Sequence, residues 1–277
     1  MDFKWVKYEV EDGILTLTIN QPEKMNAQNA DTMIEMERAF DVADNDDLVR
    51  VVIVTGAGAS ENYFMERMQG REDNQPHRDE GGVLTLRIYD MKKPVIAAIN
   101  GAAVGIGITM TLPMDIRIAS KNARMGFVFA RRGIVFDGCA SWFLPRAVGI
   151  STAAEWVYSG KIFPAQEAYD KKLISEIVEP EDLMPRARQI AAEIVQNTSS
   201  ISVALCRQLM WKMLGADHPM EAHIIESKSL NWIFGMPDAR EGIESFIGKR
   251  PPAFPMKLSS DMPVFYPWWK QREFKYY

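Results

Sequence analysis

An apolar segment from Lys93 to Met110 (KPVIAAINGAAVGIGITM) has the residue types best suited to binding a developing negative charge. It turns at Asn100-Gly101 and continues through further glycines. Because glycine has no side chain, backbone N–H groups at such a turn can approach a ligand oxygen closely. A membrane span is disfavoured, since Asn100 and Thr109 interrupt the apolar run. A closely packed strand–helix junction without chemistry is the other interpretation that the segment allows.

Asp137 is the acidic residue best placed to act as an acid or base, because it lies between Phe136 and Gly138-Cys139. Burial in apolar surroundings raises the pKa of a carboxyl group, which would suit Asp137 to carry a proton between neighbouring carbons. The same pattern is typical of an N-cap, in which the Asp side chain accepts hydrogen bonds from the first turn of the next helix. The residues alone leave both interpretations open.

Cysteine and histidine show no spacing typical of a metal site. Cys139 and Cys206 lie far apart, and the three histidines form neither an HxxxH pair nor a cluster with cysteine. Zinc sites in proteins depend on such clusters. We therefore expect no metal ion, and we interpret His218 and His223 as structural or interfacial residues.

The composition is that of an ordinary globular protein, with 277 residues, 47% hydrophobic and 25% charged. A net charge of −5 and a pI near 5.4 provide no general attraction to nucleic acid or to an anionic membrane. The first residues, MDFKWVKYEVEDG, contain no apolar signal core and no transit pattern. We expect a cytoplasmic protein that binds neither nucleic acid nor membrane.

The elements that must position these residues alternate between strand and helix, which predicts an α/β fold. Residues 14–19 alternate between apolar and polar, 31–43 have helical periodicity, and 51–54 form a β-branched run typical of a buried strand. The polar segment 59–82 is long enough to be a functional lid. From about residue 151 the pattern is mostly helical, and Asp238 is predicted to cap a helix.

Several motifs, taken in order, resemble the crotonase family, also called the enoyl-CoA hydratase/isomerase superfamily, up to about residue 250. They are Asn20-Gln21-Pro22-Glu23-Lys24-Met25-Asn26-Ala27, Val51-Val52-Ile53-Val54-Thr55-Gly56-Ala57-Gly58, Lys93 to Gly101, Met114 to Ala119, and Asp238-Ala239-Arg240-Glu241-Gly242 followed by Phe246 and Lys249-Arg250. The resemblance is greatest to the isomerase-like branch. It implies a spiral core of ββα turns over residues 1–200, a helical trimerisation region over 201–250, and a proline- and aromatic-rich tail over 251–277.

The resemblance also implies an oxyanion hole, in which two backbone N–H groups hold the thioester oxygen of an acyl-CoA. One donor is expected at Gly105 or Ile106, where the glycine-rich turn starts its helix. The other is expected at Met68 or Met65, depending on how the loop after Gly58 is aligned. The family's usual glycine is missing from that loop, so this half of the site departs from the pattern.

Hydratases of the family use two glutamates, and the matching positions here are Thr109 and Phe129, which cannot transfer a proton. The isomerase branch places one carboxylate later, at the position of Asp137. The resemblance therefore implies an acyl-CoA enzyme that isomerises an enoyl-CoA double bond, or performs hydratase-like chemistry, with Asp137 as acid/base. The alternatives are a binding protein that has lost this activity, and a dehalogenase or hydrolase in which Asp137 is the nucleophile.

Coenzyme A is expected to enter as part of the substrate, with no other cofactor. The resemblance assigns CoA or substrate contacts to residues in two places. They are Lys24, Met25 and Ala27 in an early loop, and Phe129, Phe246 and Lys249 later in the chain. The last two would reach the site from the C-terminal helix, in a neighbouring subunit of a homotrimer or hexamer.

Overall fold

The computed structural model describes residues 3–21, 30–57 and 78–275 of the chain. Nine strands in these ranges form two sheets. The larger sheet, in spatial order, contains β1 (Val6–Glu11), β2 (Ile14–Ile19), β3 (Val51–Gly56), β4 (Val95–Ile99), β6 (Ile116–Ser120) and β9 (Glu176–Val178). The smaller sheet contains β5 (Ala102–Val104), β7 (Arg124–Gly126) and β8 (Ile162–Pro164). Only the β1–β2 and β7–β8 pairs are antiparallel.

Ten α-helices and two short 3₁₀ turns lie within the described ranges. The helices are α1 (Ala30–Asn45), α3 (Glu80–Tyr89), α4 (Ile106–Thr109), α5 (Ala140–Val148), α6 (Ile150–Ser159), α7 (Ala165–Asp170), α8 (Leu183–Asn197), α9 (Ser200–Met213), α10 (Pro219–Ile233) and α11 (Pro237–Ile247). The 3₁₀ turns are η2 (Ala130–Arg132) and η3 (Pro180–Asp182). The predicted α/β class and the helical C-terminal region are both confirmed.

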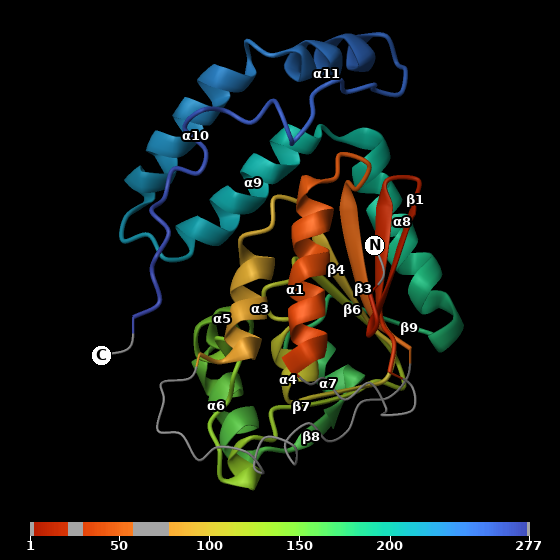
Figure 1. Cartoon of the computed structure of the whole chain (residues 1–277), viewed down its shortest axis with the longest axis vertical. Helices are drawn as coiled ribbons and strands as arrows, with labels where there is room; N and C mark the ends of the chain where they lie inside the picture. The colour runs from red at the N-terminus through yellow and green to blue at the C-terminus, as the bar shows by residue number, and fades with distance from the viewer. Residues whose placement is uncertain (1–2, 22–29, 58–77, 276–277) are drawn as a thin grey trace.

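The centre of the larger sheet is buried on both faces, which explains the β-branched run in β3. Val52 and Val54 point into the cluster formed with α1 and α3, whereas Val51 and Ile53 pack against α8. All four are at most 3% exposed. Figure 1 shows α1 and α3 side by side in front of the strands. A parallel strand covered on both faces needs apolar side chains on both, because successive residues point to opposite sides.

The turn after β4 contains a short strand that the sequence did not predict. β5 pairs in parallel with β7 before α4 begins, so the glycine-rich segment is held on both sides. β7 ends at Gly126, and Phe129 leads into η2.

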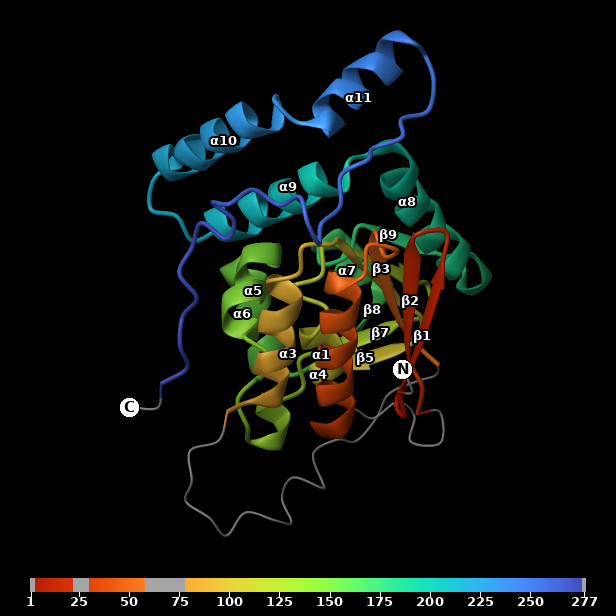
Figure 2. The ribbon, with the colours of Figure 1, turned by 45° about the horizontal axis from the view of Figure 1, so that its top comes forward.

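The C-terminal helices extend away from this core, as Figure 2 shows for α10 and α11. Their connection to the core is α9, where the Arg207 side chain is 2% exposed. Its Nε donates to Asp115 Oδ2 at 2.8 Å, and its other nitrogens donate to backbone carbonyls that include those of Tyr89 and Met91. The Trp211 ring N–H donates to the other oxygen of Asp115 at 2.7 Å.

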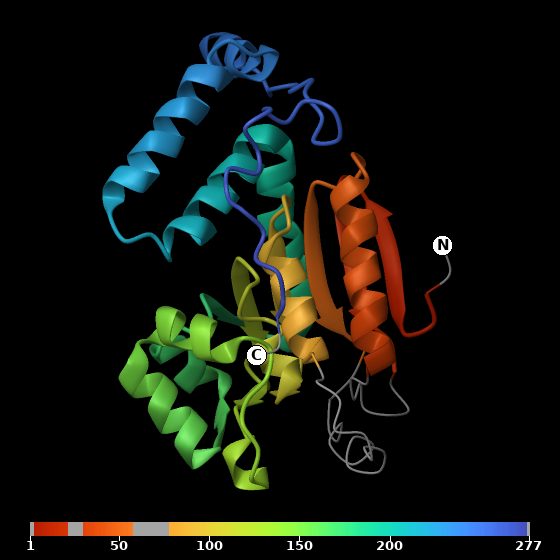
Figure 3. The same cartoon turned by 60° about the vertical axis from the view of Figure 1, so that its left-hand side comes forward.

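The tail after α11 folds back over α9 and then runs toward α3 (Figure 3). Met256 and Leu258 are buried against α9. The Lys212 ammonium lies 3.7 Å from the ring centre of Tyr89 in α3 and 4.3 Å from that of Trp269 in the tail. A cation between two aromatic faces is attracted to both, so this contact joins tail, α9 and core.

Candidate active site

The first part of the candidate site is the entry into α4. Gly105 has φ 62° and ψ −127°, a conformation that favours glycine. Its N–H donates to the Gly126 carbonyl at 3.0 Å, and its own carbonyl accepts from Thr109 N at 3.0 Å. The Ile106 N–H has no acceptor among the described residues, as expected for the first turn of a helix. Of the two predicted donors, Ile106 is therefore the one whose N–H is not engaged by a described residue.

The second part is Asp137, which lies between η2 and α5. Its Oδ1 accepts a hydrogen bond of 2.7 Å from the Thr109 hydroxyl, which belongs to α4. The N-cap residue of α5 is Cys139, whose side chain makes no capping hydrogen bond. The capping interpretation of Asp137 is therefore wrong. Its carboxylate is instead turned toward the helix that begins at Ile106.

Thr109 and Phe129 occupy the two positions where the resemblance placed hydratase glutamates. Thr109 is fully buried and Phe129 is 1% exposed within the main core. Thr109 supplies a hydroxyl in place of a carboxylate, and Phe129 supplies an apolar ring. Within the described residues, Asp137 is thus the acidic group brought to α4.

The chain around Asp137 is held in an uncommon conformation. Gly138 and Cys139 both have positive φ, at 63° and 53°. A non-glycine residue in this region is strained, and such strain often occurs at functional sites. Burial raises the pKa of the Cys139 thiol, and the negative charges of Asp79 and Asp137 act in the same direction. The thiol is thus kept protonated beside two carboxylates, which argues against its being a nucleophile.

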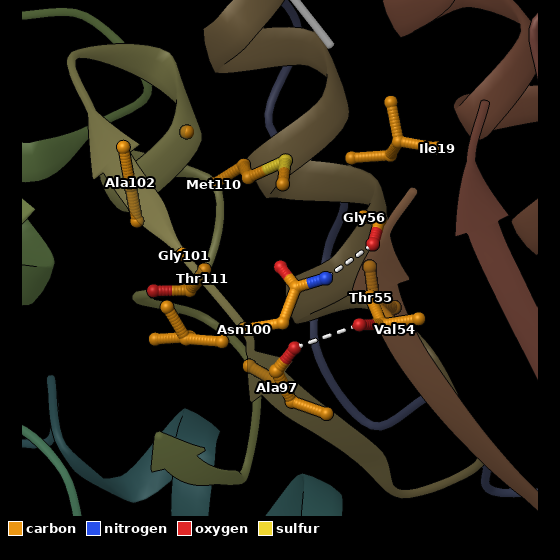
Figure 4. Close-up of a pocket in the computed structure, with 14 residues that line it drawn as sticks. Ile19, Val54, Thr55, Gly56, Ala97, Asn100, Gly101, Ala102, Met110 and Thr111 are labelled. Carbon is orange, nitrogen blue, oxygen red and sulfur yellow. Dashed lines mark hydrogen bonds between the residues drawn. The ribbon is translucent and has the colours of Figure 1, made fainter. Parts of the chain in front are cut away.

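A small cavity of about 60 Å³ lies beyond α4, at the carboxyl ends of β2, β3 and β4. In Figure 4 the Asn100 side chain points to Gly56, whose carbonyl accepts its hydrogen bond. Gly107 and Met110 of α4 line the same cavity. Ligands of open α/β sheets bind at this edge, but pockets that enclose a drug-sized ligand are several hundred Å³. The cavity can therefore hold only a small part of an acyl-CoA.

Several predicted site residues lie outside the described residues. Met65 and Met68, the candidates for the second oxyanion donor, are in 58–77, and Lys24, Met25 and Ala27 are in 22–29. The larger part of the predicted lid, 59–82, is also in 58–77, whereas its end forms the start of α3.

Phe246 and Lys249 are not brought to Asp137 within one chain. Phe246 is 84% exposed on α11, and Lys249 follows the end of that helix with φ 49°. In Figures 1 and 2, α11 lies at the top of the molecule, whereas α4 lies in the lower half of the core.

Asp79 is a residue of this site that the sequence analysis missed. It caps α3, accepting from the N–H groups of Gly81 and Gly82. A helix signal was present, because Asp79 comes before an apolar run with helical spacing that contains Val83, Leu84 and Ile88. This helix start was missed because the whole segment 59–82 was interpreted as one loop.

The described residues contain neither a candidate metal site nor a helix that could span a membrane. No group of three or more His, Cys, Asp or Glu side chains is placed to hold a metal ion there. Among the helices of the described ranges, none is long and apolar enough to cross a bilayer.

Comparison with known proteins places this geometry in context. The family model for enoyl-CoA hydratase/isomerase matches residues 9–257. Enoyl-CoA hydratase ACTT3 of Alternaria alternata is 38% identical over 248 residues, which cover 88% of this chain and 83% of that protein. A 1,2-epoxyphenylacetyl-CoA isomerase of Escherichia coli is 27% identical, covering 91% and 98%. The crystal structure of a probable enoyl-CoA hydratase/isomerase from Mycobacterium abscessus superposes with a TM-score of 0.84 at 29% identity, covering 90% and 98%.

Proposed function

The chain belongs to the enoyl-CoA hydratase/isomerase family, and on that premise we propose that it moves the double bond of an enoyl-CoA, with Asp137 transferring the proton. The family assignment makes the chain an enzyme that acts on acyl-CoA. The single observation that favours isomerisation is the hydrogen bond of 2.7 Å from Thr109 to Asp137. This bond brings one carboxylate to α4, the helix on which hydratases of the family are expected to carry one of their two glutamates.

The proposed reaction begins with removal of a proton from C2 of a 3-enoyl-CoA by the Asp137 carboxylate. The electron pair moves toward the thioester oxygen, which becomes an enolate oxygen. Protonated Asp137 then returns the proton to C4, leaving the double bond between C2 and C3. No water is consumed, so one carboxylate suffices.

Ile106 is the proposed oxyanion donor on the α4 side. Its N–H has no acceptor among the described residues, whereas that of Gly105 is engaged by Gly126. A pre-aimed donor in a dry site is worth about 3–4 kcal/mol of the barrier. The proposal assigns the second donor to Met65 or Met68.

Thr109 fixes the orientation of the base. Its side chain is fully buried and its hydroxyl donates to one oxygen of Asp137. A buried side chain has few alternative rotamers, so the carboxylate is held before substrate arrives.

The proposed assembly is a homotrimer, alone or paired as a hexamer. Apolar side chains of the C-terminal helices are exposed in the single chain, including Phe234 at 71%, Phe246 at 84% and Ile247 at 73%. In such an assembly, Phe246 and Lys249 would contact CoA bound to a neighbouring subunit. No cofactor beyond the CoA of the substrate is proposed.

Hydration of a 2-enoyl-CoA is the second candidate, and it is favoured by the name of the 38% identical Alternaria protein. Supplying the enzyme separately with 2-enoyl- and 3-enoyl-CoA in deuterated water distinguishes the two reactions. Isomerisation gives the other enoyl-CoA, with little deuterium at C4 because Asp137 returns the proton that it removed from C2. Hydration gives a 3-hydroxyacyl-CoA, and this product alone would refute the isomerase proposal.

Asp137→Asn tests the base directly, because asparagine keeps the shape but cannot accept a proton from carbon. We expect turnover of 3-enoyl-CoA to fall by about 10²- to 10⁴-fold, the usual contribution of general acid–base catalysis. Calorimetric binding of an unreactive acyl-CoA should persist. Wild-type turnover in the variant would contradict the role of Asp137.

A further inference from the structure

We propose that Asp79 is a positioning residue for Asp137: its carboxylate holds the Gly138 amide and so fixes the chain that carries the base. The inference rests on the proposed function of Asp137. Asp79 Oδ2 accepts from Gly138 N at 2.9 Å, across 59 residues of sequence. Gly138 directly follows Asp137, so this bond fixes the backbone while Thr109 fixes the side chain.

The same carboxylate also begins α3. Oδ1 accepts from Gly81 N at 3.2 Å, and Oδ2 accepts from Gly82 N at 2.8 Å. A helix cap needs only bonds of this local kind. The additional bond to Gly138 means that one side chain sets the position of both the α3 terminus and the segment after Asp137.

The first turn of α3 packs directly against the site. A Cβ atom on Gly81 would lie 2.8 Å from Ile106 Cδ1 and 3.4 Å from Asp137 Cγ. The helix terminus therefore meets both the proposed oxyanion donor residue and the proposed base. By fixing this terminus, Asp79 sets the distance between them.

The segment held by Asp79 needs an external constraint. Gly138 and Cys139 have positive φ, and strained backbone persists only when its surroundings determine it. On the other side, a Cβ on Gly138 would lie 3.0 Å from the Thr109 hydroxyl oxygen, so the turn is packed closely against α4.

The surroundings of Asp79 suit its side chain to accept several hydrogen bonds. Asp79 lies at the N-terminus of α3, where the helix dipole favours negative charge. Its charge is further shared among three N–H groups. Its two oxygens thus hold both the start of α3 and the Gly138 amide.

Two substitutions separate positioning from capping. Asp79→Ser keeps a good N-cap, but its side chain is one bond shorter and cannot also reach Gly138. Asp79→Asn keeps the length, and its amide oxygen can accept from both Gly82 and Gly138. We expect kcat with 3-enoyl-CoA to fall about 10- to 100-fold in the serine variant, as for a base displaced by about 1 Å. KM should change by less than about twofold, because substrate binding is not lost.

Asp79→Asn is the conservative variant that should rescue turnover, to within about threefold of wild type. Thermal unfolding of both variants should match wild type within a few degrees, because both retain a cap. Wild-type kcat in the serine variant, or equal losses in both variants, would overturn the proposal.

Hydrogen exchange separates failure of this inference from failure of the proposed function. Mass spectrometry of the peptide containing Gly138 should show at least about tenfold faster amide exchange in Asp79→Ser than in wild type or Asp79→Asn. Unchanged exchange would overturn the positioning role whatever Asp137 does. If Asp137→Asn instead retains wild-type turnover, the proposed function fails, while faster Gly138 exchange would still support the contact made by Asp79.

Discussion

Helix α4 buries its apolar side chains, whereas helices α10 and α11 expose many of theirs. In α4, Ile106 is 5% exposed and Ile108 and Thr109 are fully buried. In α10 the buried residue is Ser229, whereas Leu230 is 54% exposed. In α11, Phe246 and other apolar residues face outward.

This difference shows what each region needs in order to be stable. The α4 turn buries its apolar groups within its own chain, so the candidate base and donor are set by a single core. The C-terminal helices leave large apolar groups in water, and exposed surface of this kind is typical of protein interfaces. The candidate base and the α4 donor are thus positioned by the chain's own core, whereas the outer helices expose apolar surface that the proposed assembly would cover.

The largest expected effect on stability comes from breaking the ion pair between Asp115 and Arg207, which joins α9 to the core. Asp115→Ala leaves the Arg207 guanidinium, 2% exposed, without its carboxylate. Removing one partner of a buried ion pair costs about 3–5 kcal/mol, and we expect the free energy of unfolding in urea to fall by this amount. As a control, Glu244→Gln breaks an exposed pair with Arg240 and should cost less than about 0.5 kcal/mol. A loss below 1 kcal/mol in Asp115→Ala would show that carbonyl partners alone hold α9.

Ile106→Pro removes the proposed oxyanion donor. Proline fits the first position of a helix, where the missing N–H has no helical acceptor. We expect kcat to fall about 10²- to 10³-fold, with the assembly mass unchanged. Ile106→Val retains the N–H and should keep most of the activity. Equal kcat in the two variants would exclude this N–H from the oxyanion hole.

Lys93 gives the core a pH dependence in the alkaline range. Its side chain is 1% exposed, and its ammonium donates to the Ala43 and Asp46 carbonyls. Burial lowers the pKa of Lys93 to about 8, although nearby aspartates oppose the shift. Between pH 8 and 10.5 the unfolded chain then binds more protons, so stability should rise with pH. Unfolding in urea should show wild type gaining up to about 3 kcal/mol relative to Lys93→Met over this range. Parallel pH curves would contradict the shifted pKa.

Phe246→Asp should weaken assembly without disturbing the core. Its ring is 84% exposed in the single chain, so the substitution removes little intrachain packing. We expect the subunit association constant to fall about tenfold or more, measured by sedimentation at several concentrations. Leu48→Asp is the matched control, because Leu48 is 73% exposed but lies between α1 and β3. Equal effects of the two variants would remove the distinction between the regions.

Local patterns predicted the core well. The alternation in 14–19 predicted β2 with the observed bounds, and the β-branched run predicted β3 and its burial on both faces. Such patterns are sufficient where the side-chain period alone decides which face is buried. The short strand β5 was missed because its three residues become a strand only through pairing with β7.

The candidate site was only partly predictable because distant partners determine it. Gly105 and Ile106 could not be distinguished until β7 placed the Gly126 carbonyl against Gly105. Asp238 was predicted to cap α11, and this was wrong. Met236 is the N-cap residue, and the Asp238 carboxylate instead accepts from Ser199 and from Met256 N. Both outcomes depend on residues far away in sequence, which propensity does not encode.

The tail that holds Lys212 between Tyr89 and Trp269 has an evolutionary consequence. The match to the family model stops at residue 257, so Trp269 lies outside the matched part of the chain. Asp79, Thr109 and Asp137 lie inside it. Substitutions in the tail can change how tightly it packs on α9 and the core, and they leave the proposed catalytic residues unchanged.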